Sequence, residues 1–84
     1  MKKYIEVKII MPEKVVYKDK AEFITLPAFN GEMGILPEHV NVIVQLVKGE
    51  IRIKKEGKEQ VFEIEKGFAQ VQPKEVKIFV QNIK

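Results

Sequence analysis

The side chains that perform most enzyme chemistry are scarce in this sequence of 84 residues. It contains one histidine (His39), one aspartate (Asp19) and one threonine (Thr25), and no serine, cysteine or tryptophan. A Ser-His-Asp or Cys-His nucleophile therefore cannot be assembled within one chain. A zinc site needs three or four histidine, cysteine or carboxylate ligands, which this composition does not favour. We expect no catalytic residue, no metal and no cofactor.

Two patterns resemble fragments of active sites. Glu63 and Glu65 are paired carboxylates, but they alternate with apolar residues, as on the solvated face of a β-strand. Gly31 and Gly34 form a GxxG pattern that lacks the GK[ST] of a phosphate-binding loop. Neither pattern favours catalysis, so the sequence indicates a binding or structural protein that is not an enzyme.

Composition predicts one globular domain spanning residues 1–84. The chain is 45% hydrophobic and 32% charged, with a net charge of +3. Lysine and glutamate are interspersed, so no basic tail for nucleic acid is present. No apolar run approaches the roughly 18 residues that cross a bilayer. The basic N-terminus runs into an alternating pattern, which argues against a signal peptide.

The hydrophobic pattern repeats every two residues and predicts strands without a useful helix. Turn signals recur about every 8 to 12 residues, the spacing of a β-sandwich or barrel. We therefore predict an all-β fold, a flattened antiparallel β-sandwich of about eight to ten short strands. The expected strands and apolar strand pieces are 5–11, 15–17, 23–26, 42–47, 51–54, 61–65, 68–72 and 76–80.

One stretch does not follow the alternation. FNGEMGILPEHV, residues 29–40, holds two of the five glycines, one of the four prolines and the only histidine. We expect a loop in which Gly31 and Gly34 adopt positive φ and Pro37 fixes the exit. The following VIVQLV, residues 42–47, is apolar on both faces, so we expect one face to join the core and the other to meet a partner.

Three segments carry a family resemblance. GEMGILPEH, KGEIRI and GFAQVQPKEVKIFV occur in this order and at compatible spacings. They resemble the N-terminal β-sandwich domain of the ε subunit of F-type ATP synthases, over nearly the whole chain from Tyr4 to about Val80. GEMGILPEH is specific to this family, whereas each of the other two segments alone would be weak evidence for it.

The resemblance implies a rotor subunit of the central stalk, which links the γ subunit to the membrane c-subunit ring and helps couple proton flow to ATP synthesis. It implies a peripheral subunit at the cytoplasmic face of the membrane, without insertion into the bilayer. The loop facing the c ring would comprise Asn30, Gly31, Glu32 and Met33. The γ interface would comprise Ile10, Met11, His39, Val40, Asn41 and Val42, with Val44 as a further candidate.

The chain departs from the family pattern at its C-terminus. Members usually continue into a helical hairpin, which regulates the enzyme and in some members binds ATP. This sequence stops at Lys84, where that hairpin would begin. A naturally short form and a single domain of a longer protein both remain open, and neither inhibition nor nucleotide binding by a hairpin is expected of these residues.

Other binding proteins fit the composition less well. A generic interaction module outside ATP synthase is the main alternative. A basic barrel that binds nucleic acid would need lysines interleaved with exposed aromatics. The Arg52 and Lys54 face has no aromatic ladder, and we expect Glu63 and Glu65 to neutralise it. A carbohydrate-binding sandwich usually offers tryptophan or tyrosine platforms, and only two tyrosines are present.

Overall fold

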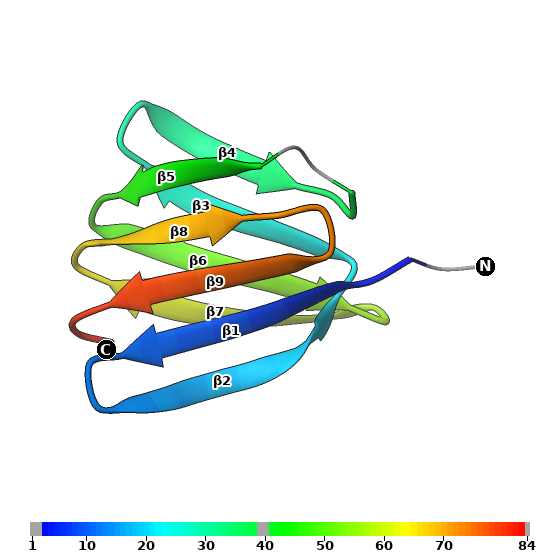
Figure 1. The fold of residues 1–84 in the computed structure, drawn as a ribbon, viewed down its shortest axis with the longest axis horizontal. Helices are drawn as coiled ribbons and strands as arrows, with labels where there is room; N and C mark the ends of the chain where they lie inside the picture. Colours follow the sequence, from blue (N-terminus) through cyan, green and yellow to red (C-terminus); the bar gives the residue numbers. More distant parts are fainter. Residues whose placement is uncertain (1–2, 39–40, 84) are drawn as a thin grey trace.

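The computed structural model describes residues 3–38 and 41–83. They form nine strands in the order that the alternating pattern predicts, with β4 as an addition (Figure 1). The strands are β1 Ile5–Met11, β2 Lys14–Ala21, β3 Phe23–Ala28, β4 Gly31–Ile35, β5 Val42–Leu46, β6 Gly49–Lys55, β7 Lys58–Ile64, β8 Gly67–Val71 and β9 Glu75–Val80. The all-β prediction is confirmed.

The strands form one curled sheet in the order β2-β1-β9-β8-β5-β3-β6-β7, with β4 paired to β3. It folds into two layers (Figure 1). We call β5, β8, β9, β1 and β2 the front layer, and β4, β3, β6 and β7 the back layer. The layers join where Ala28 of β3 pairs with Leu46 of β5. Every pairing is antiparallel except β1 with β9, which is parallel and departs from the predicted arrangement.

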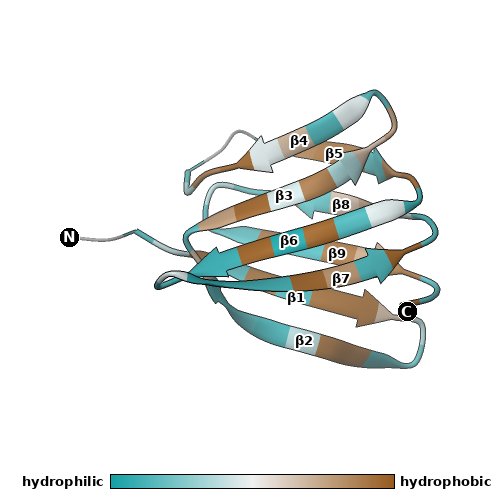
Figure 2. Ribbon diagram, turned by 180° about the vertical axis from the view of Figure 1, so that it is seen from behind, coloured by the Kyte–Doolittle hydropathy of each residue, from teal (hydrophilic) through white to brown (hydrophobic). Residues whose placement is uncertain are grey.

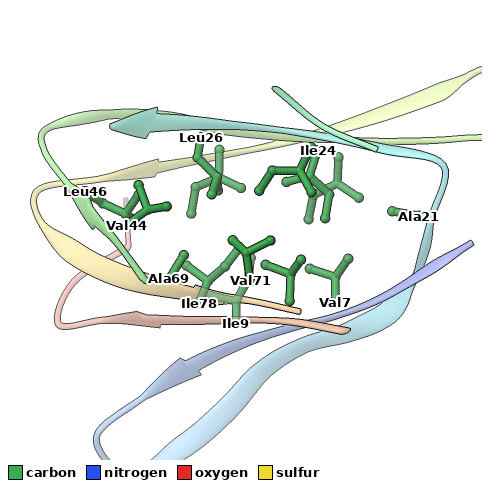
Figure 3. Close-up of a cluster of buried hydrophobic side chains, with 14 of the residues drawn as sticks. Val7, Ile9, Ala21, Ile24, Leu26, Val44, Leu46, Ala69, Val71 and Ile78 are labelled. Carbon is green, nitrogen blue, oxygen red and sulfur yellow. The ribbon is translucent and has the colours of Figure 1, made fainter. Parts of the chain in front are cut away.

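The core lies between the two layers and is apolar. Strand β6 of the back layer alternates between hydrophobic and hydrophilic residues (Figure 2), and the inward side chains of the two layers point toward one another (Figure 3). Ile5, Val7 and Ile9 of β1 are buried, as predicted from the period of two. Among the described residues no polar or charged side chain is buried. Such a close-packed body is stiff.

Seven of the eight predicted strands differ from the structure in their bounds, most of them by one to three residues. The piece at 15–17 belongs to an eight-residue strand, β2. The strand predicted at 23–26 continues through Pro27 to Ala28, and the Pro27 carbonyl accepts a hydrogen bond from Val47 N at 2.9 Å. The turn between β6 and β7 contains Glu56 and Gly57, both at positive φ.

Side chains close the seam between the edge strands β2 and β7. The rings of Tyr17 and Phe62 meet edge to face at 5.2 Å, and Lys55 Nζ of β6 lies 3.0 Å from the Asp19 carboxylate. A hydrogen bond from the Lys20 amide and the contact with Lys55 hold the pKa of Asp19 below its ordinary 3.8. A ring contact and an ion pair therefore link the two layers at their open side.

This lowered pKa makes the seam acid-sensitive. Because the folded pKa lies below the unfolded value, the contact stabilises the fold above the unfolded pKa and loses that effect as pH falls through the folded pKa. We expect the wild type to lose more stability than Asp19→Asn between about pH 5 and about pH 2. Urea unfolding at a series of pH values measures this difference. Two parallel stability curves would show that the seam does not titrate.

No helix in the ranges 3–38 and 41–83 is long and apolar enough to cross a membrane.

Candidate docking surfaces

The segment predicted as a loop is largely a β-hairpin. The turn between β3 and β4 comprises only Phe29 and Asn30, and Gly31–Met33 belong to β4. Gly31 has φ 125°, a conformation that L side chains rarely adopt, which confirms its predicted role. Glu32 pairs with Pro27 and is exposed. Of the four predicted ring-facing residues, only Asn30 lies in the turn itself, and the others are presented from a strand.

Gly34 has a different role from the predicted one. Its φ is not positive, and it lies within β4 opposite Thr25. A β-carbon at this position would come within 2.7 Å of Cζ of Phe23. The absence of a side chain therefore lets the Phe23 ring cover β4, which is a packing requirement that the GxxG pattern did not reveal.

The tip of the β3–β4 hairpin is anchored to the front layer. Phe29 N donates to the carbonyl of Gln45 at 3.0 Å, and Val47 N donates to the carbonyl of Pro27 at 2.9 Å. Despite this anchoring, the Phe29 side chain is 68% exposed. The tip lies at the same end of the sandwich as the β1–β2 turn and the C-terminus (Figure 1). It therefore presents an apolar side chain on a fixed backbone.

A second surface covers the outer side of the front layer, which we call the front face. Pairing aligns Ile10, Phe79, Phe68 and Gln45 in one row across β1, β9, β8 and β5. The two phenyl rings stack with centroids 4.9 Å apart. The row borders a groove of about 490 Å³, also lined by Met11. Ile10 and Met11 thus belong to a larger apolar surface.

The remaining predicted γ-facing residues lie farther away. Asn41 and Val42 are exposed at the start of β5, where Val42 pairs with Val71, whereas the groove borders the other end of that strand. His39 and Val40 fall outside the described residues. Val44, the further candidate, is only 8% exposed and belongs to the core. The predicted set is therefore split between two ends of the front layer.

The sequence interpretation did not single out two aromatic side chains of the front face, the exposed Phe68 and the half-buried Phe79, whereas Ile43 lies in the segment 42–47 that was expected to turn one face to a partner. Ile43 is 71% exposed and Phe68 is 48% exposed. The two-residue hydrophobic period could have revealed the two aromatic side chains. Each occupies a strand position whose side chain points away from the core, where a polar residue is usual. Large apolar residues in that phase indicate a surface that another molecule covers.

The back layer carries charges that pair with one another. Arg52 contacts Glu50 at 2.6 Å and Glu59 at 3.2 Å. The register places Arg52 opposite Val61, and its ion-pair partners are Glu50 and Glu59 in place of the predicted Glu63. Among the described residues no group of three or more His, Asp or Glu could hold a metal ion. The two apolar surfaces are therefore the strongest candidates for function.

Comparison with known proteins shows where this architecture occurs. The epsilon chain of ATP synthase from Elusimicrobium minutum is 46% identical over 71 residues, covering 83% of this chain and 53% of that protein. The epsilon chain from Bacillus subtilis is 34% identical over 79 residues, covering 94% of this chain and 60% of that protein. The chain thus spans somewhat more than half the length of these relatives.

Solved structures show the same fold. A chain in the Euglena gracilis mitochondrial ATP synthase, in a structure of OSCP, F1 and c-ring, matches with a TM-score of 0.89 and 26% identity over 96% of this chain and 52% of that one. A chain in the central stalk and c-ring structure from Tetrahymena thermophila matches in fold with a TM-score of 0.77 at 18% identity, over 100% of this chain and 69% of that one. The family model for the ATP synthase delta/epsilon chain, beta-sandwich domain, matches residues 4–84, and this chain belongs to that family.

Proposed function

We propose that this domain is a non-catalytic element of the central stalk in a proton-translocating F-type ATP synthase. It holds the γ subunit to the c-subunit ring and helps couple proton flow to ATP synthesis. The observation that carries the proposal is that one sandwich of this family exposes apolar side chains both at the hairpin tip and along the front face. The relatives' name and the stalk structures support it. In this role the protein is a peripheral subunit at the cytoplasmic face of the membrane.

The hairpin tip is the surface proposed to meet the c ring. Asn30 and Gly31 shape the tip, and Glu32 offers an exposed carboxylate beside it. Met33 packs partly against the core, so it supports the tip more than it contacts a partner. A carboxylate at the edge of an interface orients a partner through its charge and contributes modestly to affinity.

The front face is the surface proposed to meet γ. Ile10 and Met11 border its groove, and Asn41 and Val42 lie at the far end of β5. A long interface along the front layer would include both groups. His39 and Val40, outside the described residues, remain part of the proposed γ interface through the family resemblance.

Replacing Glu32 with lysine tests the ring-facing surface. The side chain is exposed, so we expect the Glu32→Lys domain to fold with a stability within about 0.5 kcal/mol of the wild type. In an enzyme reconstituted in vesicles, we expect weaker coupling between proton pumping and ATP turnover, because the charge that faces the ring is reversed. Proton pumping per ATP hydrolysed is the measurement.

Glu63→Lys is the matched control, since Glu63 is an exposed carboxylate on β7, which is separated from β4 by β3 and β6. It should leave coupling unchanged. Normal coupling in Glu32→Lys, or equal loss in both variants, would refute the ring-facing role of Glu32.

A further inference from the structure

A row of lysines lies beside the apolar row of the front face. Lys8 pairs with Lys18 of β2 on one side and with Lys77 of β9 on the other. Their neighbours along β1 and β9 are buried, so the three side chains point outward together. Like charges directly opposite one another destabilise a sheet. Three lysines that lie opposite one another despite this cost indicate that their positive charge serves a function.

The carboxylates on this surface neutralise the row only in part. Glu75 lies 3.5 Å from Lys8 and 3.8 Å from Lys77, so one carboxylate serves two lysines. Within the part of the chain that the structure describes, Lys18 has no ion pair. The next row places Glu6 beside Lys20. The outer side of β2, β1 and β9 therefore retains positive charge.

The lysine row and the apolar row are adjacent. Lys8 and Ile10 are two residues apart on β1, and Lys77 and Phe79 are two residues apart on β9. A strand rises about 3.3 Å per residue, so the rows lie about 7 Å apart. The front face thus offers an apolar strip bordered by a cationic strip, which complements a segment with apolar residues along one side and carboxylates beside them.

We propose that the front face binds an acidic amphipathic segment of the γ subunit. The apolar side of that segment lies over Phe68, Phe79 and Ile10, and its carboxylates face Lys8, Lys18 and Lys77. This inference rests on the proposed function and adds the chemistry of the partner's contact segment. The stacked phenyl pair is the anchor, since buried aromatics dominate interface energies.

Other occupants fit this surface less well. Nucleic acid would need free aromatic faces, but Phe68 and Phe79 each cover one face of the other. A second copy of this chain would bring only Glu6 and Glu75 on its own front face, accompanied by the same lysines. Recognition of an anionic lipid surface takes a cluster of about four to eight basic residues, and here Glu6 and Glu75 lie among the lysines.

The test is binding of this chain to the purified γ subunit across a salt series. Lys8, Lys18 and Lys77 are changed together to glutamine, and Phe68 is separately changed to serine. We expect about tenfold weaker binding from each change at low salt. The deficit of the lysine variant should shrink at high salt, because salt screens the charges. The deficit of Phe68→Ser should persist.

The controls come from the back layer. For the lysine variant, the control changes the exposed Lys54 and Lys58 together to glutamine. For Phe68→Ser, the control is Val61→Ser, which removes an apolar side chain that is 43% exposed, close to the value for Phe68. Both control variants should bind γ as the wild type does. Thermal melting of all four variants establishes that each is folded before its affinity is compared.

The possible outcomes distinguish a failure of the proposed function from a failure of this inference alone. A wild-type chain that does not bind γ contradicts the proposed function. Binding of γ that is insensitive to the front-face changes refutes this inference alone. The inference is equally refuted if the same changes abolish binding to a single-stranded oligonucleotide, to vesicles with anionic lipid, or to a second copy of the chain in sedimentation, while γ binding stays intact.

Discussion

A Val44→Asp chain should fail to fold, whereas an Ile43→Asp chain should fold normally. The two positions are neighbours on β5 and point to opposite faces, with Val44 only 8% exposed and Ile43 71% exposed. Val44 lies in the apolar core (Figure 3), which offers a carboxylate no polar partner among the described residues. An unpaired charge there costs about 4 kcal/mol or more. That is most of the stability of a domain this small.

Circular dichroism and urea unfolding measure the result. We expect no cooperative transition for Val44→Asp, and a midpoint close to the wild type for Ile43→Asp. The second variant also reports on function, because its new carboxylate lies on the front face and should weaken γ binding without unfolding the domain. A folded Val44→Asp chain would show that the layers are less tightly packed than the structure indicates.

The strands were predictable because their burial follows a simple period. One side of β1 and β9 is buried and the other is solvated, so apolar residues recur at every second position. The turn at Glu56 and Gly57 was predictable for a local reason too, since two positive φ angles favour a glycine. Features that depend on neighbouring residues alone are visible in a single sequence.

The missed features depend on contacts between distant residues. β4 contains two glycines and an exposed glutamate, so nothing in its own sequence indicates a strand, and β3 supplies the pairing. The role of Gly34 is set by Phe23, eleven positions earlier. The parallel pairing of β1 with β9 joins the two ends of the domain. No local pattern encodes these partners.

The residues of the candidate surfaces also divide into those that the sequence indicates and those that depend on contacts between distant residues. The family resemblance supplied Glu32 and the tip, and also Ile10 and Met11, as candidates. Phe68 and Phe79 were overlooked because each looks ordinary in its own strand, and they become a surface only when β8 and β9 pair. The lysine row likewise exists only in the register of three strands that are distant in sequence.

Replacing Gly67 with alanine should produce the other large loss of stability. Gly67 begins β8 and pairs with Val80 of β9. A β-carbon there would overlap the carbonyl oxygen of Phe79 and lie 3.1 Å from Cγ1 of Val80. The obstacle is backbone in the middle of the front layer, so no side-chain rotation can relieve it. Overpacking of this kind costs about 3 kcal/mol, at the upper end of the usual range.

Urea unfolding of Gly67→Ala measures this cost, with Lys66→Ala as the matched control. Lys66 is the exposed preceding residue, so its loss should change stability by no more than about 0.5 kcal/mol. If the chain relieves the overlap by moving β8 from β9, the Phe68–Phe79 stack separates as well. Any folded Gly67→Ala protein should then bind γ more weakly than Lys66→Ala does. Wild-type stability in Gly67→Ala would mean that β8 and β9 do not approach as closely as the structure shows, and the anchor of the front face would lose its structural basis.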